Sequence, residues 1–229
     1  MEKGRTAILY FAFRPEMEAV RKPIFSNHGR KVNVQFYHDL QDELFDRLTP
    51  LGLPVIHIAD NEQRGNGFAE RITNAVEDVW AKGYERVIVL GNDCPELDID
   101  SYQRCIEWLD KGNSCLIPTQ HGGAGLIALH KSQYNASHWI DLEWQSAATF
   151  DELFDCLSSC KVLDRTLTEL NTLADAYMYL ELRKYANDEI ALIIDGILNP
   201  LRQFVSLSFT GSDLTFQQSR KLRGPPFKA

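Results

Sequence analysis

Short apolar runs alternate along the chain with segments whose apolar residues recur at helical spacing. The apolar runs predict strands over residues 6–13, 54–58, 86–90, 114–117 and 125–129. The spaced segments predict amphipathic helices over residues 39–48, 68–79, 101–111 and 150–157. Strands that alternate with helices are typical of a layered α/β fold. We therefore predict a three-layer α/β sandwich with a mainly parallel sheet.

The run over residues 86–90 is the most informative strand candidate. After Arg86 it contains only Val, Ile and Leu, which suits a strand that is buried on both faces at the centre of a parallel sheet. The next helix is predicted to begin at Asp100, whose side chain would cap the first turn, and to stop at Gly112.

The C-terminal part of the chain does not continue this alternation. It carries one apolar run over residues 190–198, a second over residues 204–209 and a basic, Pro-rich tail. We divide the chain into an α/β domain over residues 1–186 and a C-terminal appendage over residues 187–229. Residues 187–216 are predicted to bury their apolar side chains on the core or across the two-fold axis of a homodimer, because so much exposed apolar surface promotes aggregation. The final residues, roughly ten, are predicted to be poorly ordered.

Composition narrows the class of protein. The 229 residues are 44% hydrophobic and 24% charged, which is typical of a globular chain and excludes a disordered or disulfide-scaffold protein. The 24 basic and 32 acidic residues give a net charge of −8, the opposite of the bias expected for a protein that binds nucleic acid. A small phosphorylated ligand is compatible with this charge, because a few local cations suffice to bind it.

Hydropathy and cysteine usage bear on location. No apolar run approaches the ~20 residues needed to span a bilayer, and the N-terminal run predicts a first strand rather than a signal peptide. The five cysteines include no Cys-x-x-Cys pair, and Cys156 and Cys160 are spaced one turn apart on a predicted helix with no His nearby. We predict reduced, mostly buried thiols in a cytoplasmic protein.

The segment Gly91-Asn92-Asp93-Cys94-Pro95 directly follows the predicted central strand. Ligands of open α/β sheets bind at the carboxyl ends of the strands, and a carboxylate held there can ligate a divalent ion that bridges a diphosphate. Asp93 is therefore the leading candidate for a Mg²⁺ or Mn²⁺ ligand. The alternative is that Asp93 only caps the turn after the strand.

The loop over residues 119–123 lies between two predicted strands. Its two glycines, Gly122 and Gly123, would let the backbone approach a sugar or a phosphate, and His121 could contact the substrate or a metal. A plain hairpin turn with a solvated His explains the same pattern equally well.

A cationic segment follows the first predicted strand. Arg14, Arg21 and Lys22 lie where a phosphate group is often bound, and the guanidinium group suits bidentate phosphate contacts. The alternative is a solvated loop. Residues 63–71, with Gly65 and Gly67, are typical of a loop that enters a helix N-terminus and can bind an anion there, although their charges also suit an ordinary first turn.

Several catalytic patterns are absent from the sequence. It has no Gly-x-Ser-x-Gly elbow, no P-loop and no dinucleotide fingerprint, and no Ser or Cys has a recognisable His partner. Aromatic residues do not alternate with a basic patch, so a nucleic-acid platform is not indicated.

Taken together, these segments resemble a bacterial family described as glycosyltransferase-like. The resemblance is most specific over residues 63–71 and 87–97, where the family has a Gly-Ser-Asp-Cys-Pro loop in place of Gly-Asn-Asp-Cys-Pro. Residues 118–123 are similar to the family's Pro-x-x-Asp-Gly-Gly segment, and residues 144–146 to its Trp-Ser/Thr segment. The resemblance spans about residues 5–180 and implies the glycosyltransferase-A fold, which is related to nucleotide-diphospho-sugar transferases.

The chain departs from the family pattern at three places. His121 stands where the family has Asp, and Asn171, within residues 169–172, stands where the family's Asp-Val-Asp-Thr segment has an acidic residue. The family's Lys-Thr-Arg phosphate motif is only approximated by Arg21-Lys22-Pro23. Asp93 is retained. The resemblance therefore implies a fold and a class of ligand rather than a reaction.

Two functions follow from this resemblance. The first is an enzyme that transfers a sugar from a nucleotide-diphospho-sugar, or a nucleotidylyl group, with electrostatic stabilisation of the leaving diphosphate. The second is a catalytically degenerate fold member that binds a nucleotide or a protein. The residues implied in ligand binding are Arg14, Arg21, Lys22, Asp93, His121, Gly122 and Gly123, with Asp93 as the Mg²⁺ or Mn²⁺ ligand.

Overall fold

The computed structural model describes residues 6–183 and 188–200. These residues contain six strands and eight α-helices. The strands are β1 (Thr6–Tyr10), β2 (Val55–His57), β3 (Arg86–Leu90), β4 (Ser114–Pro118), β5 (Ala124–His130) and β6 (Cys160–Val162). The helices are α1 (Pro15–Arg21), α2 (Arg30–Leu48), α3 (Phe68–Ala81), α4 (Ile99–Asp110), α5 (Ala136–Asp141), α6 (Thr149–Cys156), α7 (Leu173–Leu182) and α8 (Glu189–Leu198). Short 3-10 turns are η2 (Ser26–His28), η3 (Thr49–Leu51) and η4 (Lys131–Gln133).

The strands form one sheet in the order β2-β1-β3-β5-β4-β6. Strand β5 is antiparallel to both neighbours, and the other three pairings are parallel. The predicted mainly parallel sheet is thus confirmed. The predicted central strand is confirmed as well, because β3 has a neighbour on each side and Val87 and Val89 are buried.

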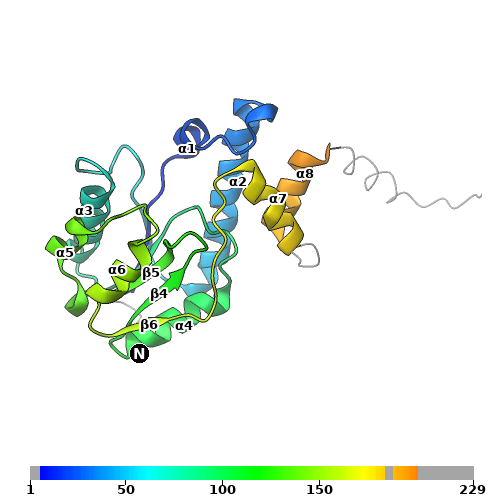
Figure 1. Cartoon of the computed structure of the whole chain (residues 1–229). Coiled ribbons are helices and arrows are strands. Elements are labelled where there is room, and N and C mark those ends of the chain that lie inside the picture. Colours follow the sequence, from blue (N-terminus) through cyan, green and yellow to red (C-terminus); the bar gives the residue numbers. More distant parts are fainter. Residues whose placement is uncertain (1–5, 184–187, 201–229) are drawn as a thin grey trace, which may run out of the picture.

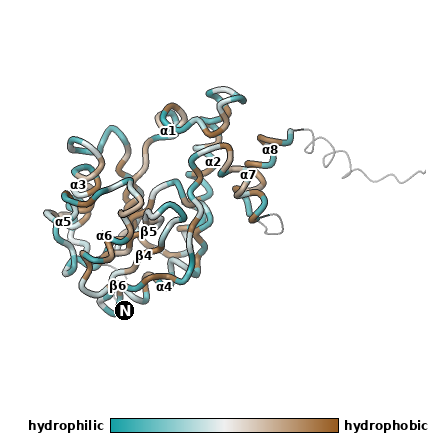
Figure 2. The backbone as a smooth tube through the Cα atoms, in the orientation of Figure 1, coloured by the Kyte–Doolittle hydropathy of each residue, from teal (hydrophilic) through white to brown (hydrophobic). Residues whose placement is uncertain are grey.

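Alternate residues of the strands face two different helical layers, which is the period-2 geometry of a strand. In β3, Val87 and Val89 pack with helices α3, α5 and α6, whereas Ile88 and Leu90 pack with α4 and the end of α2. The helices lie on both sides of the sheet in Figure 1, and Figure 2 shows hydrophobic residues both in the sheet and along α7 and α8. The three-layer sandwich is therefore confirmed.

A third apolar cluster lies beside the sheet and joins helices α1, α2, α7 and α8. Figure 1 shows α7 and α8 next to one another at the side of α2. Within the predicted appendage, Ile190 and Ile194 of α8 are buried in this cluster, whereas Leu192 is 57% exposed. Residues 188–200 thus pack on the same chain. The remainder of the predicted apolar segment, residues 201–216, lies outside the described residues, as does the tail.

Some local predictions were wrong. Helix α4 is capped by Asp98 and not by Asp100, because the Asp98 carboxylate accepts a hydrogen bond of 2.8 Å from the backbone N–H of Ser101. Cys156 and Cys160 do not share a helix, since the first ends α6 and the second begins β6.

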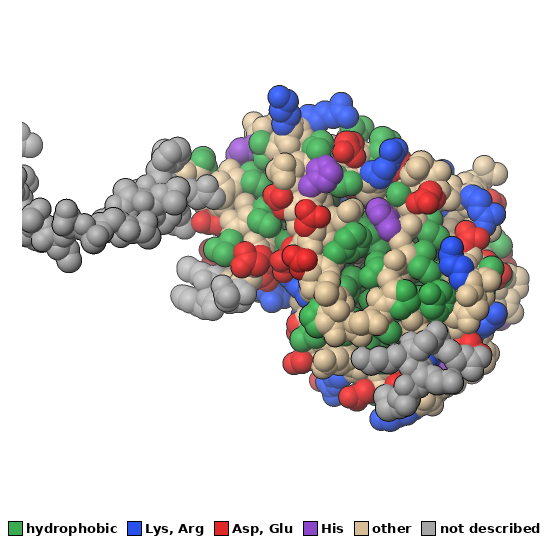
Figure 3. Space-filling view, turned by 180° about the vertical axis from the view of Figure 1, so that it is seen from behind, with side chains coloured by type: hydrophobic (Ala, Val, Ile, Leu, Met, Phe, Trp, Pro, Cys, Tyr) green, Lys and Arg blue, Asp and Glu red, His purple; other side chains and the backbone are tan. Residues whose placement is uncertain are grey.

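The structure also bears on the predictions that were made from cysteine usage, hydropathy and charge. All five cysteines are free, but only Cys105 and Cys115 are buried and the other three are half-buried. In the part of the chain that is described, no helix is long and apolar enough to cross a membrane. On the face seen in Figure 3, acidic and basic side chains are interspersed.

Candidate functional site

Two adjoining hollows lie at the carboxyl ends of β1 and β3, where ligands of α/β sheets bind. The outer hollow has a volume of about 390 Å³ and the inner hollow one of about 190 Å³. Both are lined by Phe11, Phe68, Gly91, Asp93 and Gln145, so they form one continuous cleft. The buried strands β1 and β3 position this cleft, because the chain leaves each strand directly into its lining.

The outer hollow carries three cationic side chains beside the carboxyl groups of Glu18 and Asp93. Arg21 and Lys22 reach it from the end of α1, and Arg71 reaches it from the first turns of α3. The guanidinium carbon of Arg21 lies 4.2 Å from the centre of the Phe13 ring, a cation–π contact that orients the side chain. Helix α1 begins with Pro15 at its first position, which is favourable there because Pro lacks the unsatisfied N–H.

Lys22 and Asp93 form an ion pair within this hollow. The Asp93 side chain is 46% exposed and that of Lys22 is 22% exposed, so the pair is open to a ligand. Glu18 lines the same hollow; it is largely buried, and its Oε1 accepts a hydrogen bond of 3.1 Å from the backbone N–H of Phe13. Burial raises the pKa of Glu18, the Lys22 ammonium opposes this rise, and Asp93 adds to it.

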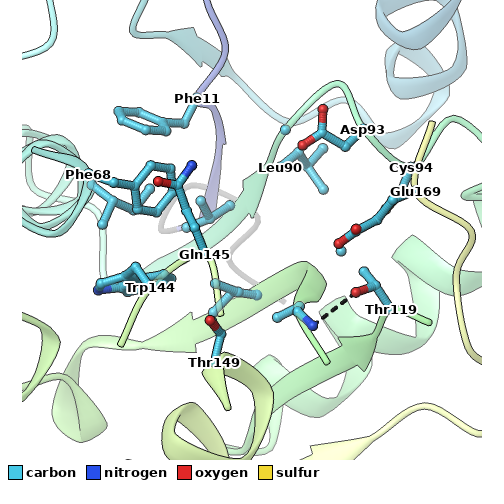
Figure 4. Close-up of a pocket in the computed structure, with 17 residues that line it drawn as sticks. Phe11, Phe68, Leu90, Asp93, Cys94, Thr119, Trp144, Gln145, Thr149 and Glu169 are labelled. Carbon is cyan, nitrogen blue, oxygen red and sulfur yellow. Dashed lines mark hydrogen bonds between the residues drawn. The ribbon is translucent and has the colours of Figure 1, made fainter. Parts of the chain in front are cut away.

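The inner hollow has two unlike walls, which Figure 4 shows on opposite sides of the cavity. One wall is aromatic: the ring centres of Phe11 and Phe68 lie 5.8 Å apart, and those of Phe68 and Trp144 lie 5.4 Å apart. The other wall is rich in oxygen and contains the Asp93 and Glu169 carboxylates. An aromatic wall that faces oxygen acceptors suits a ring that carries hydroxyl groups.

Backbone contacts bring the two carboxylates together from distant parts of the chain. The backbone N–H of Leu170 donates to the Asp93 carbonyl at 2.8 Å, which places Glu169 beside the β3 loop. The β4–β5 turn closes the same wall, since the Gly123 N–H donates to Thr119 Oγ1 at 3.0 Å (Figure 4). A Cβ on Gly123 would lie 3.0 Å from Glu169 Oε1, so the glycine leaves room for that carboxylate.

Cys94 lines the inner hollow next to Asp93. Burial, followed by the nearby charges of Asp93 and Glu169, raises the pKa of the thiol well above its ordinary value. A protonated thiol is a poor nucleophile. The structure thus agrees with the absence of a nucleophile motif in the sequence.

The structure brings together four of the seven predicted site residues. Asp93 lines both hollows, Arg21 and Lys22 line the outer one, and Gly123 lines the inner one. The other three predicted residues, Arg14, His121 and Gly122, line neither hollow.

Arg14 lies outside the cleft, in an exposed ion pair with Asp60. Its Nε and Nη2 donate to the two Asp60 oxygens at 3.0 and 2.8 Å, and this pairing lowers the pKa of Asp60 to about 2. Arg14 is thus paired with Asp60 and is not part of the lining that contains Asp93. His121 is exposed at the tip of the β4–β5 turn.

Gly122 has a structural reason to be glycine. Its φ is 82°, and a Cβ there would lie 2.2 Å from the carbonyl oxygen of Ala147. The loop after α5 thus occupies the space that a side chain, or an approaching sugar, would need. The hairpin interpretation of residues 119–123 fits the observed antiparallel β4–β5 pair.

Most residues that line the cleft were not among the seven predicted ones, and three of them bear directly on ligand chemistry. Arg71, Trp144 and Glu169 all lie within segments that carry the family resemblance, but none of them is a position where the chain departs from the family pattern. The usable signal for Glu169 was an acidic residue at the first position of residues 169–172.

A divalent cation fits this donor set only together with a ligand. Within residues 6–183 and 188–200, no group of three His, Cys, Asp or Glu side chains is arranged to hold a metal ion. Asp93 and Glu169 supply two carboxylates on one wall. Mg²⁺ is commonly held by one or two carboxylates plus substrate phosphates, so a cation that enters with a diphosphate suits these two residues.

Solved structures resemble this fold. A supposed nucleotide-diphospho-sugar transferase from Desulfovibrio desulfuricans G20 superposes with a TM-score of 0.71 at 16% identity, over 89% of this chain and 99% of that one. At this identity the likeness establishes the fold alone. Rv0371c from Mycobacterium tuberculosis H37Rv superposes with a TM-score of 0.44 at 11% identity, over 77% of this chain and 98% of that one, which supports no argument.

The sequence has no match among curated proteins. A family profile matches residues 25–146, which hold α2, the central strand β3 and the Asp93 loop. These residues make up more than half of the 229-residue chain. The chain therefore belongs to the family described as uncharacterized protein conserved in bacteria (DUF2064).

Proposed function

We propose that this protein binds a nucleotide-diphospho-sugar in the two-part cleft and transfers the sugar to an acceptor. The observation that carries the proposal is the continuity of a cationic hollow with a hollow that has an aromatic and an acidic wall. The fold shared with a supposed nucleotide-diphospho-sugar transferase supports the same class of ligand.

The outer hollow would hold the diphosphate. Arg21, Lys22 and Arg71 line it, and three cations can neutralise the charge that develops on a leaving nucleoside diphosphate. An arginine matches two phosphate oxygens at once, whereas the lysine supplies a point charge. Fixed charges of this kind favour the transition state because they need no reorganisation during the reaction.

The inner hollow would hold the sugar. The Phe68 and Trp144 rings offer apolar faces to the C–H groups of a sugar ring, and Glu169 and Thr119 offer acceptors to its hydroxyl groups. A bound Mg²⁺ or Mn²⁺ would supply further positive charge to the leaving diphosphate. Asp93 and Glu169 would hold it, and Lys22 would then have to leave Asp93.

A nucleotide-binding protein without transferase activity is the second candidate. While Lys22 stays paired with Asp93, Arg21 and Arg71 remain to bind a diphosphate, and such binding requires no group transfer. His121 and Asn171, two of the three departures from the family pattern, lie outside the lining of both hollows.

Calorimetric titration tests the proposal directly. The ligands are ADP, GDP, UDP and dTDP and their glucose conjugates, each titrated with and without Mn²⁺. We expect at least one conjugate to bind, and the variant Arg21→Ala/Lys22→Met to lose more than about tenfold in affinity because two phosphate contacts are removed. Lys161→Met, which removes an exposed lysine of β6, is the matched control and should bind as the parent does.

The outcomes separate the two candidates. Release of glucose from the bound conjugate to water or to a supplied acceptor, lost in Glu169→Gln, supports the transferase. Binding without any such turnover favours the second candidate. A protein that binds none of the eight ligands contradicts both.

A further inference from the structure

Gln145 lies at the boundary between the two hollows. It lines both of them, and Figure 4 shows its side chain standing in the cavity between the aromatic wall and Asp93. In the proposed function, this is where the diphosphate meets the group attached to it. A side chain at this point can therefore contact both parts of such a ligand.

The backbone of Gln145 has an unusual conformation. Its φ is 62°, and within residues 6–183 and 188–200 it is the one non-glycine residue with a positive φ. A residue with a Cβ pays a conformational cost in this region, which glycine avoids. Such strain persists only where the surrounding structure imposes it, and it often occurs in ligand sites.

The loop is fixed on both sides of Gln145. On one side, the Trp144 indole N–H donates to the Trp139 carbonyl at 2.7 Å. On the other side, Ala147 packs so closely on Gly122 that a Cβ on that glycine would lie 2.2 Å from the Ala147 carbonyl oxygen. Rigid contacts on each side thus impose the conformation of Gln145 and aim its side chain into the cleft.

The Gln145 amide is available to a ligand. It has no hydrogen-bond partner within the described part of the chain, and the residue is exposed. A glutamine amide both donates and accepts, so it can bind a phosphate oxygen or a sugar hydroxyl group. The strained backbone and the unpaired amide are independent observations, and each is typical of a residue that contacts a ligand.

We propose that Gln145 is a specificity-determining residue whose amide contacts the group attached to the diphosphate, so that the cleft prefers a nucleotide-diphospho-sugar to the bare nucleoside diphosphate. This inference rests on the proposed function, since it assumes that the diphosphate occupies the outer hollow. It adds a residue that discriminates between the two ligands, without a part in the chemical step.

The test compares the tightest-binding glucose conjugate of the panel with its parent nucleoside diphosphate. Gln145→Ala should weaken binding of the conjugate roughly three- to tenfold, the effect of one lost hydrogen bond, and should change binding of the nucleoside diphosphate less than about twofold. Gln145→Gly should show the same loss and a higher melting temperature than Gln145→Ala, because glycine relieves the strain.

A merely structural role predicts a different result. If both variants bind the conjugate as tightly as the parent protein and only the melting temperature moves, the inference is wrong while the proposed function stands. An equal loss for the conjugate and the nucleoside diphosphate also overturns it. If the parent protein binds no member of the panel, the inference fails together with the proposed function.

Discussion

The outer and inner hollows differ in how the chain builds them. The outer hollow takes its charges from three places: the segment after β1, the first turns of α3 and the loop after β3. Each of these lies within or directly after a regular helix or strand. The inner hollow adds the β4–β5 turn, the irregular loop before α6 and the segment before α7. In the proposed function, the outer hollow would supply general phosphate affinity and the inner hollow would supply selectivity.

Gly122→Ala should have the largest effect and should act on the inner hollow. The new Cβ would lie 2.2 Å from a backbone oxygen of Ala147, at a φ of 82°. Strain and overpacking together should lower the free energy of unfolding by roughly 2–5 kcal/mol. Binding of a nucleoside diphosphate, where the variant still folds, should survive better than binding of its glucose conjugate.

Gly112→Ala is the matched control for this prediction. Gly112 has a φ of 79°, but nothing lies within 4 Å of a Cβ built there. Only the conformational cost of a Cβ in the left-handed region applies, about 1–2 kcal/mol. Chemical denaturation compares the two variants. Equal losses would show that the contact between Gly122 and Ala147 does not hold the inner wall in place.

Lys22→Met should have the next largest effect and should act on the outer hollow. It removes the cation that pairs with Asp93, so nucleoside diphosphate binding without metal should fall about tenfold. The same change leaves Asp93 free, so Mn²⁺ binding to the protein alone should become tighter. Electron paramagnetic resonance of free Mn²⁺ measures this. Unchanged or weaker Mn²⁺ binding would mean that Lys22 and the cation do not compete for Asp93.

Glu169→Gln should have a smaller effect, confined to the inner hollow. The amide keeps the size of the side chain but removes a charge beside Asp93, so Mn²⁺ and the glucose conjugate should bind several-fold more weakly. Binding of the nucleoside diphosphate without metal should not change. Glu107→Gln, at an exposed position of α4, is the control. A loss of metal-free nucleoside diphosphate binding would contradict the division into two hollows.

The same division explains what the sequence could predict. Strand β3 matches its predicted bounds, because the four consecutive apolar residues after Arg86 leave little choice of structure. Asp93 could be found because it follows that strand directly. Helix α1 was not predicted, because it has only seven residues. It is held by the third apolar cluster, in which it packs with α2. Short helices depend on tertiary contacts, which local spacing does not report.

The position of Glu169 could not be derived from spacing at all. Its approach to Asp93 depends on the hydrogen bond from the Leu170 N–H to the Asp93 carbonyl, between segments that are far apart in the sequence. The same holds for Arg14, whose partner Asp60 lies beyond β2. Such partners decide which of several arginines faces a cleft. The number of residues between an arginine and the preceding strand does not.

Glu18→Gln should have the smallest effect, and its sign depends on pH. Burial raises the pKa of Glu18 above the ordinary value of 4.5, so the folded state holds this proton more tightly than the unfolded state. The associated stability is fully present below the ordinary pKa and is lost as the pH rises through the raised one. The neutral amide keeps an oxygen that can accept from the Phe13 N–H and avoids that loss.

The melting temperature of Glu18→Gln should therefore exceed that of the parent protein by a few degrees at neutral pH. The difference should disappear as the pH falls below the ordinary glutamate pKa of 4.5. Because the change also removes a negative charge behind Lys22, nucleoside diphosphate binding should tighten slightly. Equal melting temperatures at every pH would show that Glu18 carries no burial cost. A variant that melts below the parent protein at neutral pH, with the gap closing as the pH falls, would mean that the pairing of Glu18 with Lys22 outweighs burial.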